Sequence, residues 1–172
     1  MNIILLSGGS GKRLWPLSND IRSKQFIKIF QRDDGTYESM VQRVYRQIKT
    51  IDADAAVTIA TSRSQVSVIH NQLGDGVGIS VEPCRRDTFP AIALATAYLV
   101  DVMKVSSEES VVVCPVDPYV EDDYFEAVLI QKQESIFIHA MVRLTARKGK
   151  SLQEAVAHMV DLPLDIIYME TG

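Results

Sequence analysis

Residues 5–18 read LLSGGSGKRLWPLS, and they follow a short apolar run that begins at Ile3. The apolar run predicts a buried strand, and the glycines directly after it predict a tight loop in which a ligand can approach the backbone closely. Successive N–H groups in such a loop form a concavity that binds anions. Because Lys12 and Arg13 place two cations at its rim, we expect the loop to hold a polyphosphate.

Two better-known phosphate loops do not fit this stretch. A Walker loop needs a glycine five residues before its Gly-Lys pair and a Ser or Thr after it, whereas this chain has Leu6 and Arg13 at those places. A dinucleotide fingerprint starts at Gly9-Ser10-Gly11, but Leu14 stands where its last glycine belongs. The alternative to a phosphate loop is a tight strand-to-loop connection with incidental charge.

The length of 172 residues and the ordinary amino-acid composition predict a single globular domain. The net charge of −4 argues against a broad nucleic-acid surface. Cys84 and Cys114 make no disulfide framework, so we expect a reduced, cytoplasmic protein. No apolar run approaches the ~20 residues of a membrane span, and the N-terminus lacks the features of a signal peptide.

Apolar segments and helical periodicity alternate along the chain, which predicts an α/β fold. The fold class that we expect is a Rossmann-like, mostly parallel sheet with helices on both faces. The segment 25–30 is expected to be extended and to be followed by a turn at Asp33-Asp34-Gly35. The expected strands cover residues 3–6, 55–60, 77–81 and 110–114, and the expected helices cover 39–49, 61–73 and 88–104.

A polar segment follows the expected strand that ends at Glu82. The Glu82 and Asp87 carboxylates can accept hydrogen bonds from the exocyclic amine of a nucleobase, and Arg86 can meet a phosphate or a base edge. The helix that begins at Thr88 offers free N–H donors at its N-terminus. A structural alternative stays open, in which Asp87 or Thr88 merely caps that helix.

A second carboxylate, Asp117, directly follows the expected strand 110–114 within Pro115-Val116-Asp117-Pro118. A carboxylate at this place suits Mg²⁺ that is shared with substrate phosphate oxygens. The alternative is a turn-forming aspartate before Pro118. Asp122 and Asp123 fit the start of a helix better than extra metal ligands.

These segments together resemble a known enzyme family. The run that begins at Gly8 has the order Gly-Gly-x-Gly-x-Arg-Leu-x-Pro-Leu, and with Lys24 it resembles the sugar-phosphate nucleotidyltransferases. Trp15 and Lys24-Gln25-Phe26 resemble the mannose-1-phosphate guanylyltransferase branch. Residues 82–93 resemble the nucleobase-reading segment of that branch, although Asp87 stands where the branch usually has Asn. An amide both donates and accepts whereas a carboxylate only accepts, so this departure changes the hydrogen bonds that the position can make to a base.

The resemblance implies the transfer of GMP from GTP to mannose-1-phosphate, with Mg²⁺ as cofactor and GDP-mannose and pyrophosphate as products. It implies Arg13 and Lys24 as catalytic residues and Asp117 as the metal ligand. The nucleotide-binding residues that it implies are Leu6, Gly8, Gly9, Gly11, Lys12, Glu82, Arg86, Asp87 and Thr88.

The resemblance covers about residues 1–126, and we expect this part to be an incomplete nucleotidyltransferase fold that forms the nucleotide-binding half. Residues 127–172 match no motif of the family and are expected to form a mainly helical tail packed on that half. Three alternatives stay open: a truncated, catalytically silent guanine-nucleotide-binding remnant without the sugar pocket, a tail that binds a partner, and a homo-oligomer in which a second chain covers the incomplete sheet.

Overall fold

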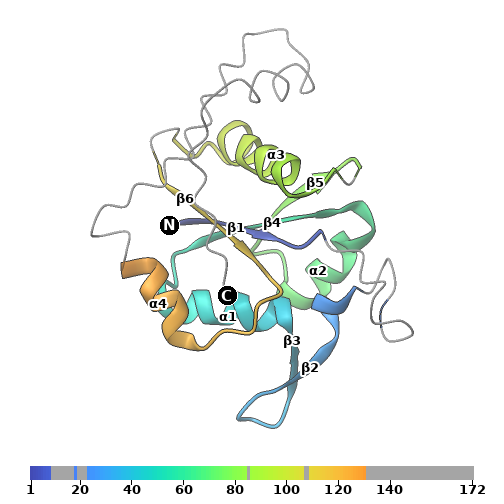
Figure 1. The fold of residues 1–172 in the computed structure, drawn as a ribbon, viewed down its shortest axis with the longest axis vertical. Helices are drawn as coiled ribbons and strands as arrows, with labels where there is room; N and C mark the ends of the chain where they lie inside the picture. Colours follow the sequence, from blue (N-terminus) through green and yellow to red (C-terminus); the bar gives the residue numbers. More distant parts are fainter. Residues whose placement is uncertain (9–17, 19–22, 85, 107–108, 131–172) are drawn as a thin grey trace, which may run out of the picture.

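The computed structural model describes residues 1–8, 18, 23–84, 86–106 and 109–130. Its centre is a four-stranded parallel sheet with the strand order β5-β4-β1-β6 (Figure 1). The strands are short apolar runs whose side chains are mostly buried, as expected for a sheet covered on both faces. They are β1 (Asn2–Leu6), β4 (Ala56–Ser62), β5 (Gly78–Glu82) and β6 (Val111–Pro115).

The register brings the carboxyl ends of all four strands to one edge of the sheet. Leu6 pairs with both Ala60 and Pro115, and Ser62 pairs with Glu82. We call this side the carboxyl edge. In open parallel sheets ligands bind beyond this edge, so the register places the segments that follow β1, β5 and β6 where a ligand is expected.

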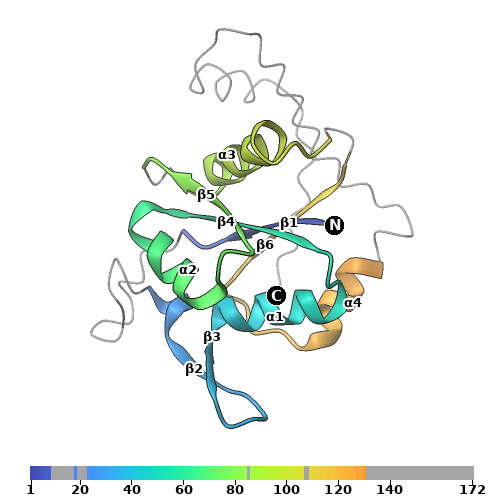
Figure 2. The ribbon, with the colours of Figure 1, turned by 180° about the vertical axis from the view of Figure 1, so that it is seen from behind.

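Helices cover both faces of the sheet, as predicted. The helices α1 (Met40–Ile51), α2 (Val66–Leu73) and α4 (Asp122–Ile130) lie on one face, and α3 (Thr88–Asp101) lies on the other (Figures 1 and 2). The first face holds the larger core cluster, which includes Leu5, Ile48 and Ile59. The second face holds a smaller cluster around Ile4 and Leu99.

Local sequence signals fix several element ends. Ser39 caps α1 through a capping box with Gln42, in which the Ser39 side chain accepts from the Gln42 N–H and the Gln42 side chain accepts from the Ser39 N–H. Gly74 ends α2 with a φ of 75°, a conformation that glycine adopts without a steric cost. The turn predicted at Asp33-Asp34-Gly35 is present, and Gly35 there has a φ of 80°.

The structure corrects two predicted segments. Only part of residues 25–30 is extended, because η2 (Lys24–Phe26) forms a 3₁₀ turn that directs Gln25 and Phe26 inward, and β2 (Lys28–Gln31) follows it. The strand β2 forms an antiparallel hairpin with β3 (Tyr37–Ser39), which was not predicted. The helix expected from residue 61 begins later, since residues 61 and 62 still pair with β5; η3 (Arg63–Gln65) and α2 come after them.

No helix among the described residues has the length and apolar character needed to cross a lipid bilayer. The helix predicted to start near Asp122 is present as α4. The tail predicted for residues 127–172 lies outside the described residues from position 131 onward. The division at residue 126 therefore stays a prediction.

Candidate functional site

Two groups of predicted residues lie at the carboxyl edge. We call Ser7, Lys24 and Asp117, with the residues that hold them, the β1–β6 end, because they follow those two strands. We call residues 82–88 the β5–α3 end, because they connect β5 to α3.

Lys24 and Asp117 are in contact at the β1–β6 end, although 93 positions separate them in the sequence. The Lys24 Nζ donates to Asp117 Oδ2 at 2.9 Å, and the two side chains are 47% and 51% exposed. An ion pair this exposed contributes little to stability. The contact therefore does little to hold the fold, and it places a cation and a carboxylate side by side at the edge.

The segment that carries Asp117 is held to α1. The Val116 N–H donates to the Leu6 carbonyl at 3.3 Å, which continues the pairing of β6 with β1. Beyond Asp117, the Val120 carbonyl accepts from both Arg43 Nη2 and Gln47 Nε2 at 3.0 Å. The Arg43 guanidinium also lies 4.4 Å from the centre of the Tyr119 ring. Anchors on both sides thus fix the position of the Asp117 backbone.

The first glycine of the predicted phosphate loop approaches the β5–α3 end. A Cβ atom at Gly8 would lie 3.3 Å from Oε1 of Glu82, a contact tighter than most side chains tolerate. Glu82 is the last residue of β5 and is buried. Gly8 therefore lets the backbone after β1 pass close to the Glu82 carboxylate, and two predicted nucleotide-binding residues come together.

Between Glu82 and α3 the described side-chain contacts are local. Asp87 caps α3 by accepting from the Thr88 N–H at 2.9 Å, which is the contact that the capping alternative predicts. Its φ of 77° and ψ of −174° lie in a region that residues other than glycine rarely occupy. The Arg86 Nε lies 3.5 Å from the Cys84 Sγ, a contact that raises the pKa of Arg86. Capping does not exclude a role for the Asp87 carboxylate in binding a base.

Several predicted residues cannot be placed. Gly9, Gly11, Lys12 and Arg13 lie outside the described residues, so their roles stay predictions. Leu6 lies at the end of β1, next to Ser7. The predicted roles of the residues that the structure does place are likewise proposals.

The donor set at Asp117 limits the kind of metal site that it can form. No cluster of three or more His, Cys, Asp or Glu side chains suited to a metal is present in the described part of the chain. Mg²⁺ is commonly bound by one or two carboxylates together with waters and substrate phosphates. An exposed single carboxylate fits a metal ion that arrives with phosphate oxygens, and it does not fit a site built from protein ligands alone.

Sequence reasoning missed the buried polar side chains behind Lys24. Gln25 and Gln65 are buried and hydrogen-bonded near the ends of β1 and β4. Gln25 could have been suspected from its place beside Lys24 in the family motif. Gln65 has no such signal, because it lies within an ordinary polar stretch after β4.

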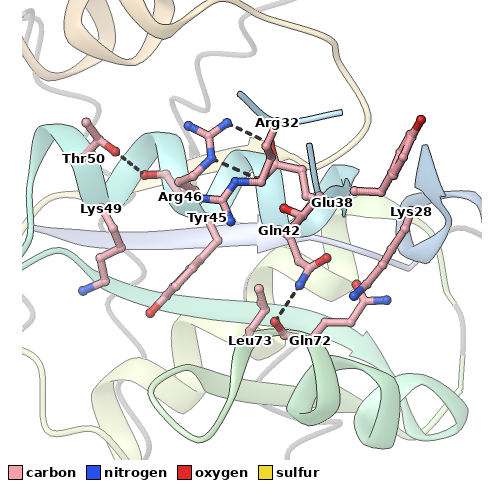
Figure 3. A pocket seen from close by; sticks show the side chains of 12 residues that line it. Lys28, Arg32, Glu38, Gln42, Tyr45, Arg46, Lys49, Thr50, Gln72 and Leu73 are labelled. Carbon is pink, nitrogen blue, oxygen red and sulfur yellow. Dashed lines mark hydrogen bonds and ion pairs between the residues drawn. The ribbon is translucent and has the colours of Figure 1, made fainter. Parts of the chain in front are cut away.

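A separate pocket of about 570 Å³ lies between the β2–β3 hairpin, α1 and the end of α2 (Figure 3). Three of the cations that line it, Arg32, Arg46 and Lys49, have structural partners. Arg46 donates twice to the buried Glu38 carboxylate, at 2.8 and 3.1 Å, and this pairing raises the pKa of Arg46. Lys49 donates to the Ala53 and Ala55 carbonyls. We therefore assign this array to holding the hairpin and the end of α1 in place.

The sequence matches the family model described as nucleotidyl transferase over residues 2–151. This chain belongs to the nucleotidyl transferase family. The match runs past residue 126, where the motif-level resemblance ends. The parallel sheet agrees with that assignment.

The named relatives indicate which branch of the family this chain resembles. The chain is 31% identical over 123 residues to an alginate biosynthesis protein AlgA of Pseudomonas aeruginosa, covering 69% of this chain and 24% of that protein. It is 35% identical over 98 residues to a mannose-1-phosphate guanylyltransferase of Salmonella montevideo, covering 54% of this chain and 19% of that protein. The predicted resemblance to mannose-1-phosphate guanylyltransferases is thus confirmed, and the chain spans about a quarter or less of the length of these relatives.

Solved structures support the fold. A structure titled mannose-1-phosphate geranyltransferase, from Thermus thermophilus, matches with a TM-score of 0.58 and 26% identity, over 77% of this chain and 37% of that one. A putative glucose-1-phosphate thymidylyltransferase from Bacillus anthracis matches with a TM-score of 0.56 and 21% identity, over 76% of this chain and 51% of that one. The second likeness shows the fold alone.

Proposed function

We propose that this chain binds GTP at the carboxyl edge and transfers its GMP group to mannose-1-phosphate, releasing pyrophosphate. The observation that carries the proposal is the Lys24–Asp117 contact at the carboxyl edge, in a chain that resembles proteins named mannose-1-phosphate guanylyltransferase. Because the chain spans only part of those relatives, the activity and the substrates of a whole enzyme are part of the proposal.

The reaction needs charge neutralisation more than proton transfer. The attacking oxygen of a sugar phosphate is already an anion, so no strong general base is required. Lys24 is proposed to stabilise the charge on the reacting phosphates. Arg13 and the N–H groups after Gly8 are proposed to hold the leaving pyrophosphate by hydrogen bonds. These roles suit a site built from a loop, two cations and one carboxylate.

Asp117 is the residue that would hold Mg²⁺ in this proposal. The ion, when bound, supplies positive charge to the phosphate oxygens. In the structure the Asp117 carboxylate pairs with the Lys24 ammonium at 2.9 Å. A phosphate that drew Lys24 away would leave Asp117 to the cation, so we expect both side chains to exchange partners on nucleotide binding.

The β5–α3 end is proposed to hold the nucleobase. Glu82, Asp87 and Arg86 offer acceptors and donors for base edges, and Thr88 begins the helix behind them. The buried Glu82 lies beside Gly8, so a nucleotide whose base meets Glu82 would have its phosphates near the carboxyl end of β1, on the side of Lys24. This continuity supports a single nucleotide that spans both ends.

The direct test is GDP-mannose formation from GTP and mannose-1-phosphate with Mg²⁺, followed by chromatography. We expect product from the wild type and loss of product in Arg13→Ala and Asp117→Ala. The matched control is Asp75→Ala, because Asp75 is an exposed carboxylate that precedes β5 and lies near the opposite edge of the sheet. Equal losses in Asp75→Ala and Asp117→Ala would contradict the role of Asp117.

A second candidate is nucleotide binding without turnover. It is favoured by the single metal-binding carboxylate that the described site offers. Calorimetry with GTP and Mg²⁺ separates the two functions. Binding with product supports the transferase, and binding without product at high protein concentration supports the second candidate. The absence of binding would contradict both.

A further inference from the structure

Lys24 lies on a segment that cannot hold its own shape. The turn η2 has three residues and two hydrogen bonds, from the Phe26 N–H to the Ser23 carbonyl at 3.0 Å and from the Ile27 N–H to the Lys24 carbonyl at 3.2 Å. A single isolated turn of helix is unstable because its ordering costs more than its few hydrogen bonds return. The position of Lys24 must therefore depend on contacts made by its neighbours.

Gln25 ties this turn to the end of β1. Its side chain is only 3% exposed, and Nε2 donates to the Ser7 carbonyl at 2.9 Å and lies 3.3 Å from the Ser7 Oγ. The Ser7 N–H in turn donates to the Ala60 carbonyl at 2.9 Å. Because an unpaired amide is costly to bury, these contacts hold the Gln25 side chain in place. They therefore also hold the backbone of the neighbouring Lys24.

Gln65 ties the residue before the turn to the end of β4. It is fully buried, accepts from Thr61 Oγ1 at 2.8 Å and donates to Ser23 Oγ at 3.0 Å. Ser23 is the N-cap of η2 and is itself fully buried. The contacts thus link β4 to the residue immediately before Lys24 by a chain of buried hydrogen bonds.

The two glutamines act on opposite sides of one exposed residue. Ser23, Gln25 and Phe26 are buried, whereas Lys24 alone in this segment faces solvent and reaches Asp117. We propose that Gln25 and Gln65 are positioning residues, which hold residues 23–26 against the ends of β1 and β4 and thereby keep the Lys24 ammonium beside the Asp117 carboxylate. The catalytic meaning of this arrangement rests on the proposed function, but the placement of Lys24 does not.

The test is the rate at which an amine-acylating reagent modifies Lys24, measured by peptide mass spectrometry on the intact, folded chain. Lys28 and Lys104 in the same sample are the internal references. In the wild type we expect slower modification at Lys24 than at the exposed Lys28, because the Lys24 amine is engaged by Asp117. The Asp117→Asn variant gives the modification rate of a Lys24 that is not paired with a carboxylate.

Gln25→Ala and Gln65→Leu each remove one anchor. We expect each to raise the modification rate of Lys24 about fivefold toward the Asp117→Asn value, the effect of losing roughly one hydrogen bond, with the Lys28 rate unchanged. Gln65→Glu should have a smaller effect, because its carboxylate can still accept from Thr61, and the Ser23 hydroxyl, which accepts from Gln65 in the wild type, can turn to donate to it. An unchanged Lys24 rate in folded Gln25→Ala or Gln65→Leu would overturn the proposal.

Leu99→Ala controls for a general loss of stability, because Leu99 is buried against the opposite face of the sheet. It should lower the midpoint of urea unfolding without changing the Lys24 rate. If Gln25→Ala does not fold, the contrast between Gln65→Leu and Gln65→Glu decides the question: equal Lys24 rates in these two variants would overturn the proposal.

Turnover adds a separate readout. If the wild type forms GDP-mannose, Gln25→Ala should lower kcat about fivefold with little change in the KM for GTP, because a misplaced Lys24 affects the reacting phosphates more than binding. If neither the wild type nor the variants form GDP-mannose, the proposed transferase function is contradicted. The modification rates still report on the position of Lys24.

Discussion

The two ends of the carboxyl edge are held in different ways. At the β1–β6 end, side chains from distant parts of the sequence meet, as Lys24 does with Asp117, and buried amides such as Gln25 lie behind them. At the β5–α3 end, the described contacts of Arg86 and Asp87 reach only one or two residues along the chain. The first end is held by contacts between distant elements, whereas Arg86 and Asp87 at the second end have local contacts and, among its described residues, only Glu82 meets other strands.

This difference fits a division of work between the ends. Phosphate chemistry demands that charges be placed accurately, and accurate placement needs anchors from several elements. Base recognition can use a shorter connection, because a backbone-determined turn already orients its side chains. The predictions below test how far the two ends differ.

The largest expected difference is in thiol reactivity. Cys84 at the β5–α3 end is exposed, whereas Cys114 in β6 is buried, and burial raises the pKa of the Cys114 thiol to about 11. Because the thiolate is the reactive form, Cys114 should react at pH 8 at least about a hundredfold more slowly than Cys84. An aromatic disulfide reagent measures both rates, and Cys84→Ser should abolish the fast phase. Two equal fast phases in the native protein would show that the β1–β6 end is open.

Removing the cation of each end should affect catalysis unequally. Lys24→Ala should lower the rate of GDP-mannose formation by about a hundredfold, the usual effect of losing one group that stabilises transition-state charge. Arg86→Ala should lower it by less than about tenfold and should act mainly through the KM for GTP. Initial rates over a range of GTP concentrations give both values. A larger loss in Arg86→Ala than in Lys24→Ala would reverse the assignment of the two ends.

Alkaline pH should lower the free energy of unfolding through ionisation of Cys114, which lies in β6. The folded-state pKa of Cys114, about 11, lies above its ordinary value of 9.0, so the unfolded chain loses this proton first. The stability that this raised pKa contributes is fully present below pH 9. It is lost as the pH rises, and the loss reaches about 2 kcal/mol near pH 11. Urea unfolding from pH 8 to 11 measures the free energy of unfolding.

Cys114→Ala is the matched control for this pH dependence, since burial also raises the pKa of Tyr124 and adds a loss in the same direction. Subtracting the two curves gives the contribution of the thiol together with its charge effect on Tyr124. A difference between wild type and Cys114→Ala that stays constant with pH would contradict the burial of an un-ionised thiol.

The smallest expected effect concerns the strained backbone at Asp87. Asp87→Gly should raise the free energy of unfolding by about 1 kcal/mol, because glycine relieves the strain at a φ of 77° and replaces an N-cap at the cost of only a few tenths. Asp87→Ala should instead be destabilising, since it keeps the strain and loses the cap. Urea midpoints rank the three proteins.

At Asp87, the affinity for GTP should change in the opposite direction to the stability of the fold. If the carboxylate meets the base, Asp87→Gly should weaken GTP binding while stabilising the fold, and Asp87→Asn should keep the cap and alter the choice of base. A more stable Asp87→Gly that binds GTP as well as the wild type would leave Asp87 with a capping role only.

The sheet was predictable because each strand is a compact apolar run between polar turns. The runs before Ser7, Glu82 and Asp117 predicted which residues would lie at the carboxyl edge, and the structure places all three there. The start of α2 was predicted wrongly, since Thr61 and Ser62 resemble capping residues. Their pairing with β5 outweighs that local preference.

The contacts within the site were less predictable than its members. The motif singled out Lys24 and Asp117 separately, but their meeting depends on β6 pairing with β1, which no local pattern encodes. Gln65 lies 42 positions from Ser23 and comes near it only through the placement of β4 beside β1. Long-range register decides such contacts, whereas single-sequence patterns report mainly on neighbours.

The strand order has a consequence for biosynthesis. The strand β1 is made first, yet its neighbours β4 and β6 are synthesised much later. A nascent chain therefore carries Lys24 for a long interval before its carboxylate partner leaves the ribosome, and non-local pairing of this kind forms slowly. The ion pair between the first and the last described strand regions is completed only when the sheet closes, so an incompletely synthesised chain lacks the paired charges of the finished edge.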